Sequence, residues 1–221
     1  MMTLYHCMSA RSFRPLWTLE ELGLPYRLVM LPFPPRVKVP DYLAVNPLGT
    51  IPAFIDGETR MTESAAICEY LASRYDAGGL SVLPDEPEYG RYLNMLHFGE
   101  ATLTFPQTLL LRYGRFETPE RRLPQVVEDY SRWFLSRLKG VGAAVTETPY
   151  ICGSRFTVAD ISVGYALMLA EHLQLDSKFS EQVREYWHRI KNRRAFSSAL
   201  DAQLRAAIQQ DVPTIPAPLT S

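Results

Sequence analysis

Hydrophobic and polar positions change their spacing once along the chain, near residue 76. Before that point, short alternating stretches are interleaved with stretches of helical spacing. Strands are predicted at 3–6 and 26–31, on either side of a helix at 13–22. Leucines recur every three positions in that helix. It closes at Gly23, because glycine readily adopts the left-handed conformation that ends helices.

A hairpin and a further helix follow. Residues 51–55 and 58–61 flank an Asp-Gly pair at 56–57, which supplies the positive φ values of a tight hairpin turn. From Ser64 to Tyr75 the spacing is helical again. This order of strands and helices predicts a small α/β sandwich.

After residue 76 the pattern becomes helical throughout. We expect an α/β domain at 1–76, a linker rich in Gly and Pro at 77–87, and an all-helical domain at 88–221. The helical stretches each carry an apolar stripe and cover 89–104, 119–139, 158–172 and 180–191.

Two features mark the boundaries within this helical part. Thr157 and Asp160 have the spacing of a capping box, and loss of the Asp160 cap is expected to cost about 0.5–2 kcal/mol. Residues 212–221 contain three prolines and predict an irregular tail.

The composition favours a folded chain and limits its partners. Of 221 residues, 47% are hydrophobic and 21% are charged, close to the average of globular proteins. The 23 Lys and Arg residues are balanced by 24 Asp and Glu residues, so the formal net charge is −1. Without an excess of basic charge, binding to the phosphate backbone of nucleic acid is not expected.

The cysteines and the apolar spacing predict a cytoplasmic protein without a metal. Cys7, Cys68 and Cys152 are odd in number and far apart, which argues against a disulfide framework. They and the four histidines lack the spacing of metal ligands. No apolar run approaches the ~18 residues of a membrane span, and no secretion signal precedes the first strand.

Two segments carry candidate binding chemistry. Pro52 is either an ordinary edge-strand proline or a cis-proline that turns the backbone of Ile51 outward, ready to pair with a bound peptide. Ser64 is either a helix cap or part of a carboxylate site, because a helix N-terminus favours anions. Glu63 beside it has the charge to pair with an ammonium group.

A third segment, residues 6–12, leaves the carboxyl end of a strand and enters a helix, where open α/β folds place ligands. Ser9 and Ser12 each offer a hydroxyl, and Ser12 is equally suited to cap the helix. Cys7 is either a nucleophile, if the helix dipole lowers its thiol pKa, or a small apolar residue that finishes the strand. The second interpretation of Cys7 is favoured.

Together these segments resemble cytosolic glutathione S-transferases of the bacterial, serine-using type, which are theta-, delta- or zeta-like. The matching runs are Ser-Ala-Arg-Ser-Phe-Arg at 9–14, Leu-Glu-Glu-Leu-Gly-Leu-Pro-Tyr at 19–26, Asn-Pro-Leu-Gly-Thr-Ile-Pro at 46–52, Met-Thr-Glu-Ser-Ala-Ala-Ile at 61–67 and Gly-Ser-Arg-Phe-Thr-Val-Ala-Asp at 153–160. The resemblance covers nearly the full chain. It implies a thioredoxin-like domain that binds glutathione and a helical domain that contributes an electrophile pocket.

The resemblance implies a detoxifying enzyme with glutathione as co-substrate, whose thiolate attacks a small hydrophobic electrophile. The cysteinyl backbone of glutathione would pair with Ile51 across cis-Pro52. Its γ-glutamyl carboxylate would lie near Ser64 and its ammonium group near Glu63. Relatives form two-fold dimers, so a homodimer is expected, with no nucleic acid, membrane or metal as a partner.

Ser9 is the expected hydroxyl at the thiol. Serine-using relatives place it fourteen positions before the glycine that ends the first helix, and counting back from Gly23 gives Ser9. Ser12 is the runner-up, and Tyr5 is interpreted as a core residue. Relatives that transfer thiols carry cysteine at the position of Ser9, so the resemblance favours conjugation.

The remaining parts of the implied site depart from the family pattern or lie in irregular loops. Relatives often hold the glycyl end of glutathione with His, Lys or Gln before the Ile-Pro pair, where this chain has Gly49 and Thr50. Thr50 and Lys38 are the candidates for that role. The expected residues of the electrophile pocket are Met8, Phe105 and Tyr113.

Three alternatives stay open at this point. They are a glutathione-dependent isomerase, as among zeta-like relatives, a thiol transferase that uses Cys7, and a non-catalytic binding protein with the same fold. The last has no need of Ser9, Pro52, Glu63 and Ser64, whose joint presence favours catalysis.

Overall fold

The computed structural model describes residues 1–76 and 79–219. Contacts divide the chain into two compact units. One holds the described residues of Met1–Ala77 and Asn192–Thr220, and the other holds those of Gly78–Lys191. This division differs from the expected one, which placed all of residues 88–221 in a single helical domain.

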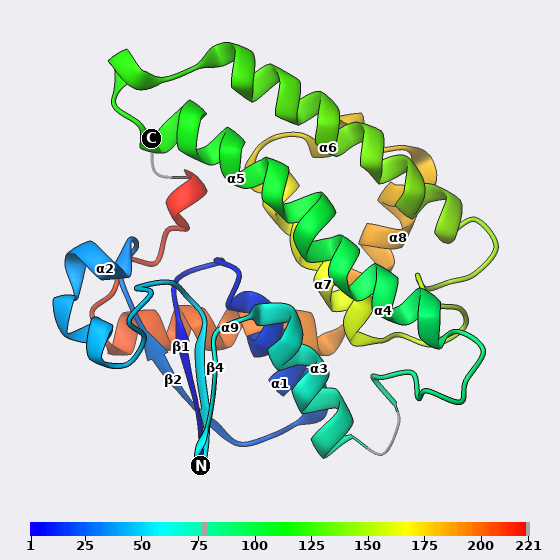
Figure 1. Ribbon diagram of the computed structural model, residues 1–221, viewed down its shortest axis with the longest axis horizontal. Coiled ribbons are helices and arrows are strands. Elements are labelled where there is room, and N and C mark those ends of the chain that lie inside the picture. Colours follow the sequence, from blue (N-terminus) through cyan, green and yellow to red (C-terminus); the bar gives the residue numbers. More distant parts are fainter. Residues whose placement is uncertain (77–78, 220–221) are drawn as a thin grey trace. The chain divides into compact units, whose positions relative to one another are not determined.

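A four-stranded sheet forms the centre of the first unit, in the order β2-β1-β3-β4 (Figure 1). The strands are β1 (Met2–His6), β2 (Tyr26–Met30), β3 (Ala53–Asp56) and β4 (Thr59–Met61). β1 pairs in parallel with β2 and antiparallel with β3, so the carboxyl end of β1 lies inside the sheet. The predicted hairpin is confirmed: β3 and β4 pair around Gly57, whose φ is 59°.

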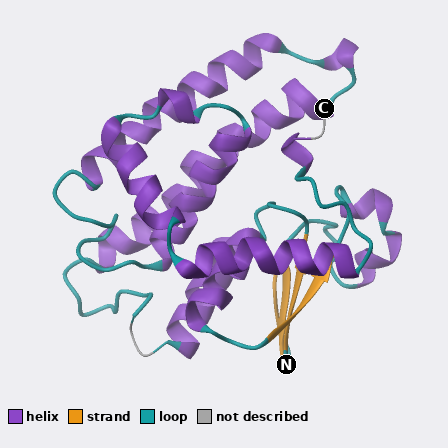
Figure 2. Cartoon of the chain, turned by 180° about the vertical axis from the view of Figure 1, so that it is seen from behind, coloured by secondary structure: helices purple, strands orange, loops and turns teal. Residues whose placement is uncertain are grey.

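Three helices complete the first unit: α1 (Phe13–Leu22), α3 (Ser64–Tyr75) and α9 (Arg194–Gln209). α1 packs against both of the others, and α9 also contacts β2. Figure 2 shows α9 running across the sheet. Phe196 of α9 packs edge-on against Phe13 and Trp17, with ring centroids 5.4 and 4.9 Å apart. This aromatic contact helps to hold the C-terminal helix in the first unit.

The connection from β2 to β3 contains two short helices, α2 (Pro35–Lys38) and the 3-10 helix η1 (Pro40–Ala44). Two X-Pro bonds of this connection are cis, Phe33-Pro34 and Ile51-Pro52. The cis alternative considered for Pro52 is therefore the one found, whereas the bond at Pro34 was not anticipated.

The second unit is helical. Its long elements are α4 (Tyr89–His97), α5 (Phe105–Leu111), α6 (Pro124–Ala144), α7 (Val158–His172) and α8 (Glu181–Lys191). π-helical segments, η2 (Phe98–Thr104) and η3 (Arg112–Phe116), follow α4 and α5. α7 is the central element, because every residue from Val158 to Ala170 is buried. α6 begins later than predicted because a separate 3-10 turn, Pro119–Arg121, occupies the start of the expected stretch.

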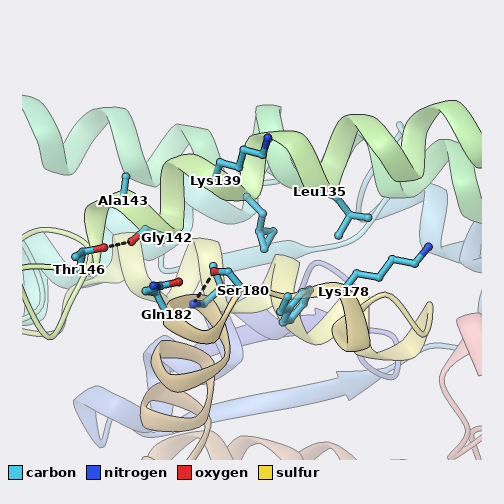
Figure 3. Close-up of a pocket in the computed structure, with 11 residues that line it drawn as sticks. Leu135, Lys139, Gly142, Ala143, Thr146, Lys178, Ser180 and Gln182 are labelled. Atoms are coloured by element: carbon cyan, nitrogen blue, oxygen red, sulfur yellow. Dashed lines mark hydrogen bonds between the residues drawn. The ribbon is translucent and has the colours of Figure 1, made fainter.

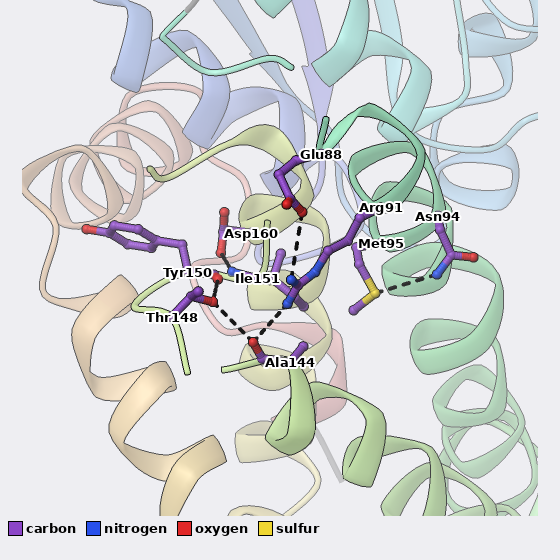
Figure 4. A network of polar contacts seen from close by, with 9 residues as sticks. All are labelled: Glu88, Arg91, Asn94, Met95, Ala144, Thr148, Tyr150, Ile151 and Asp160. Atoms are coloured by element: carbon purple, nitrogen blue, oxygen red, sulfur yellow. Dashed lines mark hydrogen bonds and ion pairs between the residues drawn. The ribbon is translucent and has the colours of Figure 1, made fainter. Parts of the chain in front are cut away.

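The predicted capping box is confirmed at the start of α7, and it belongs to a larger network. Fully buried Asp160 accepts from Thr157 N–H at 2.9 Å and from Thr157 Oγ1 at 3.1 Å. Its other carboxylate oxygen accepts from Ile151 N–H and Tyr186 OH, each at 2.9 Å. Figure 4 shows how the carboxylate reaches the chain at Ile151. Asp160 therefore fastens the start of α7 to two other segments of its unit.

Among the described residues, no helix combines the length and the apolar character that crossing a membrane requires.

Candidate functional site

The loop between β1 and α1 brings both candidate serines into the interior of the first unit. Ser9 is 3% exposed and Ser12 is fully buried. Ser9 has a φ of 50°, in the left-handed region that non-glycine residues seldom adopt. Ser12 is the N-cap residue of α1, but its side chain makes no capping hydrogen bond. The capping alternative for Ser12 is therefore not what the structure shows.

The Ser12 hydroxyl contacts His6 instead. Ser12 Oγ lies 2.6 Å from His6 Nδ1, and His6 Nε2 lies 2.8 Å from Gln203 Oε1 on α9. Burial lowers the pKa of His6 from 6.5 to about 4, so the ring is neutral at pH 7. All of these side chains are buried.

Gln203 connects this pair to Ser9. The backbone N–H of Ser9 donates to Gln203 Oε1 at 2.9 Å, and Gln203 Nε2 donates to Ser9 Oγ at 3.2 Å. A backbone N–H can only donate, so the amide atom facing it must be the oxygen. The same oxygen faces His6 Nε2, which must therefore carry the proton of the neutral ring.

These assignments fix the direction of both serine hydroxyls. A neutral His6 protonated on Nε2 has a lone pair on Nδ1, so Ser12 donates its hydroxyl proton to His6. Ser9 Oγ, by contrast, accepts from Gln203. Within the described residues no acceptor is found for the Ser9 hydroxyl proton. Of the two serines, Ser9 is the one that has a proton to offer.

The segment before β3 is held by a clamp of side chains. The carbonyl of Thr50 accepts from Tyr42 OH at 2.7 Å and from Asn46 Nδ2 at 2.8 Å. Gly49, with a φ of 62°, lies so close to Arg36 that a Cβ would come within 2.6 Å of Arg36 Cβ. This packing fixes the chain immediately before Ile51-Pro52. Within the described residues no backbone hydrogen bond uses Ile51.

Ser64 is buried at the first turn of α3, where it accepts from Arg14 Nη1 at 3.1 Å. α3 has no side-chain cap, and its N-cap residue is the exposed Glu63. The capping alternative for Ser64 is therefore not what the structure shows. Because Arg14 can only donate, the Ser64 hydroxyl proton points elsewhere. The first turn of α3 thus combines a hydroxyl donor, backbone N–H groups and a buried guanidinium behind them.

Cys7 lies in a small apolar cluster with Leu31, Tyr42 and Ala53, and is 1% exposed. Burial raises the pKa of its thiol to about 12. A thiol that stays protonated is not a nucleophile at neutral pH. The interpretation of Cys7 as a small apolar residue agrees with this geometry, and its use in thiol transfer does not.

A pocket of about 230 Å³ in the first unit brings together Met8 and Lys38, two of the candidate residues, with the loop after β2. Pro213, Ile215 and Ala217 of the C-terminal tail also line it. The tail is irregular up to a short 3-10 turn at Ala217–Leu219. The sequence pattern predicts an irregular tail at these residues, but it does not predict that the tail lines a pocket.

Phe105 and Tyr113 belong to the second unit. Phe105 begins α5 and is 54% exposed, and Tyr113 lies in η3 with the Arg112 guanidinium 5.5 Å from its ring centroid. Their expected place in an electrophile pocket stays a prediction.

A larger pocket, of about 420 Å³, lies within the second unit. Figure 3 shows it between α6 and the turn that precedes α8, with residues such as Leu135, Lys139 and Gln182 around it. The one hydroxyl group that Figure 3 shows at that turn, Ser180 Oγ, accepts from Val183 N–H at 3.4 Å and so caps α8. This pocket lacks the serine-histidine-glutamine arrangement found in the first unit.

Sequence reasoning missed His6 and Gln203. The sequence patterns place His6 at the end of a strand and in the candidate segment 6–12 without giving it a role, and they do not predict α9 as a separate helix. One signal was present: Phe196, Ala199, Gln203 and Ala207 recur at helical spacing, and all four are buried. A glutamine inside an apolar stripe requires buried polar partners, which points to a network.

Comparison with known proteins agrees with this architecture. The glutathione S-transferase N-terminal domain model matches residues 8–74. The glutathione S-transferase GstA of Escherichia coli O157:H7 is 29% identical over 205 residues, which span 91% of this chain and 98% of the relative. The glutathione S-transferase-like protein gedE of Aspergillus terreus is 30% identical over 173 residues, which span 73% and 75%.

Among solved structures, the glutathione transferase URE2P6 of Phanerochaete chrysosporium, in complex with oxidized glutathione, is similar with a TM-score of 0.81. It is 26% identical, and the match covers 93% of this chain and 97% of that one. This chain belongs to the glutathione S-transferase family. Its fold is the expected one, a thioredoxin-like N-terminal domain followed by a helical domain.

Proposed function

We propose that this protein is a glutathione transferase that conjugates glutathione to a small hydrophobic electrophile. Ser9 donates its hydroxyl proton to the glutathione sulfur and so favours the thiolate. The observation that carries the proposal is the direction of two hydroxyls, because Ser12 donates to His6 while Ser9 accepts from Gln203 and keeps its proton.

The proposed seat of glutathione follows the segment from Ile51 to Ser64. The backbone of Ile51 pairs with the cysteinyl residue, beside cis-Pro52. The γ-glutamyl carboxylate lies at the first turn of α3, where the Ser64 hydroxyl, the N–H groups and the Arg14 charge all favour an anion. The exposed Glu63 pairs with the ammonium group. Related structures that contain glutathione support glutathione as the ligand.

The glycyl end of glutathione is assigned by the same reasoning to Thr50 and Lys38. Both side chains are exposed, and the clamp on the Thr50 carbonyl holds that residue beside Ile51. Met8, which lines the pocket shared with Lys38, is assigned to the electrophile side.

The energetics of this mechanism are of the right size. A free thiol has a pKa of about 8.5, so about 3% is thiolate at pH 7. Lowering the pKa by about two units takes ~2.7 kcal/mol. One hydrogen bond to a charged group contributes about 1.5–3 kcal/mol, and a helix N-terminus adds about 0.3–1 kcal/mol. The thiol proton passes to solvent as the thiolate forms. The thiolate sulfur then forms a bond to the electrophilic carbon, and with an aryl halide the carbon–halogen bond breaks and halide leaves to solvent.

The first test is substitution of Ser9. Conjugation should fall about 5- to 15-fold at pH 7 in Ser9→Ala, because the helix N-terminus still favours the thiolate, and should approach the wild-type rate at pH 9, where the thiolate fraction recovers. The KM for glutathione should stay close to the wild-type value. Steady-state kinetics with a chromogenic aryl halide measures both. Ser73→Ala, which removes an exposed hydroxyl of α3, is the matched control.

Two outcomes would overturn this proposal in different ways. If Ser12→Ala lost thiolate formation and Ser9→Ala kept it, the donor would be Ser12. If calorimetric titration of the wild-type chain with glutathione gave no heat, and glutathione gave no thermal shift, the chain would be a non-catalytic protein with this fold. The homodimer and the cytoplasmic location stay predictions.

A further inference from the structure

Gln203 is a polar side chain in a helix face that is otherwise apolar. Its neighbours on the buried face of α9 are Phe196, Ala199 and Ala207, and Gln203 is 2% exposed. Burial of an amide without hydrogen-bond partners costs about 1–3 kcal/mol, so we expect the Gln203 amide to have partners that offset this cost. All of the partners found lie around the loop before α1.

The amide group of Gln203 uses both of its ends on Ser9. The oxygen accepts from the backbone N–H of Ser9 at 2.9 Å, and the nitrogen donates to Ser9 Oγ at 3.2 Å. The first bond holds the residue whose φ is 50°, and the second sets the rotation of its hydroxyl. This two-point contact joins residues 194 positions apart in the sequence.

The backbone N–H of Ser9, which can only donate, prevents the amide from turning over. The Nε2–H of His6 also donates to Gln203 Oε1, at 2.8 Å. A flipped amide would direct its NH2 group against the Ser9 N–H, and His6 would have to change its tautomer to accept from that group. The flipped amide would also present an oxygen to Ser9 Oγ, which would then donate its proton inward. Only the observed orientation leaves the Ser9 proton outward.

We propose that Gln203 is a positioning residue for Ser9, which turns the Ser9 hydroxyl so that its proton is available to the glutathione sulfur. This inference rests on the proposed function, because it concerns the same hydroxyl. Gln203 touches neither the thiol nor the electrophile in this account. It acts by donating a hydrogen bond to Ser9 Oγ. The hydroxyl proton of Ser9 then points away from Gln203.

The decisive variant is Gln203→Glu. A carboxylate accepts from Ser9 N–H and His6 Nε2–H as the amide does, but it cannot donate to Ser9 Oγ. The Ser9 hydroxyl then donates to the carboxylate and points inward. We expect the pKa of the bound glutathione thiol, followed by thiolate absorbance against pH, to rise as in Ser9→Ala. The new carboxylate also raises the thiol pKa through its charge, with or without Ser9. The inference therefore expects a larger rise from Gln203→Glu when Ser9 is present than in the Ser9→Ala background. An unchanged thiol pKa, or equal rises in both backgrounds, would contradict it.

Gln203→Met is the second variant and removes both contacts with a side chain of similar length. We expect conjugation at pH 7 to fall about three- to tenfold and to recover toward pH 9, because the hydroxyl is free to rotate. Gln210→Met is the matched control. Gln210 ends the same helix and bridges it to β2 through Met30 N–H and the Leu28 carbonyl, away from Ser9. Its pH profile should equal that of the wild type.

A double-variant cycle separates positioning from general destabilisation. If Gln203 acts through Ser9, Gln203→Met adds nothing once Ser9 is alanine, so the double variant matches Ser9→Ala. If the two substitutions lowered the rate of conjugation by independent factors that multiply in the double variant, the inference would be contradicted. This cycle tests the inference even if Gln203→Glu does not fold. If Ser9→Ala itself leaves the thiol pKa unchanged, the proposed donor fails. If only the Gln203 variants leave it unchanged, the proposed function stands and the inference fails.

Discussion

Each of the two units contains a buried polar network built around one fully buried titratable side chain. In the second unit it is Asp160, and in the first it is His6. Both networks connect the start of a helix to a distant segment of the same unit. They differ in how their hydrogen-bonding capacity is used.

The Asp160 network is closed. Its carboxylate accepts four hydrogen bonds, from Thr157 N–H, Thr157 Oγ1, Ile151 N–H and Tyr186 OH. Burial raises the pKa of the Asp160 carboxyl, and these bonds oppose the rise. The network around His6 and Gln203 is open at one point, the hydroxyl proton of Ser9. In the account proposed here, the closed network stabilises the fold and the open one presents the Ser9 hydroxyl proton to glutathione.

The largest expected effect is on stability, from breaking the closed network. Asp160→Ala leaves buried donors of Ile151, Thr157 and Tyr186 without an acceptor, and each such donor costs about 1–3 kcal/mol. We expect the free energy of unfolding to drop by about 3–5 kcal/mol in denaturant titrations. This expected loss exceeds the loss estimated for a helix cap alone. The cap accounts for the two bonds from Thr157, and Asp160 also accepts from Ile151 and Tyr186.

Asp129→Ala is the control for that measurement. Asp129 is an exposed carboxylate on α6 that pairs with Gln125 and Arg132, so its loss should change the unfolding free energy by less than about 0.5 kcal/mol. Equal losses of unfolding free energy for Asp129→Ala and Asp160→Ala would show that the buried network stabilises the fold no more than an exposed carboxylate does.

The second effect is the acid sensitivity of the open network. The pKa of His6 is about 4 in the folded protein against 6.5 without burial. Between pH 6.5 and 4, His6 is therefore protonated in the unfolded chain and neutral in the folded chain. Stability from His6 is therefore complete above pH 6.5 and is lost as the pH falls toward 4. The loss amounts to about 3 kcal/mol.

Urea unfolding at several pH values measures this loss. His6→Asn should flatten the dependence between pH 6.5 and 4, whereas His97→Asn, at an exposed position, should leave the wild-type slope. A His6→Asn variant with an unchanged slope would mean that His6 is not the group responsible.

The smallest effect is expected at Cys7, next to the open network but outside it. Its thiol is buried and its pKa is raised to about 12, so we expect it to take no part in the proposed conjugation. Conjugation by Cys7→Ala should stay within about twofold of the wild type. Loss of turnover in a folded Cys7→Ala variant would restore the cysteine as a candidate nucleophile.

The comparison of the two networks also shows what sequence patterns can predict. The spacing of Thr157 and Asp160 is local, so the closed network was partly predictable, although Tyr186, far along the chain, was not. The strands, the hairpin at Gly57 and helices α1 and α3 likewise follow from local patterns. Ser9, Ser64 and Pro52 could be named as candidates because they belong to contiguous motifs.

The direction of a hydroxyl is not a local property. It depends on which partner donates to Ser9 Oγ, and that partner, Gln203, lies on a helix 194 positions away. For the same reason Arg14 could not be assigned to Ser64 from the sequence. Residue types give the candidates, and long-range hydrogen bonds decide between them.

The central claim, that Ser9 offers its proton to the glutathione sulfur, is tested most directly by a crystal structure of the chain with glutathione. The account predicts the sulfur within hydrogen-bond distance of Ser9 Oγ, the Gln203 amide still on the opposite side of that oxygen, and the γ-glutamyl carboxylate at Ser64. A sulfur directed at Ser12 or at neither serine, or a glutathione that does not pair with Ile51, would contradict it.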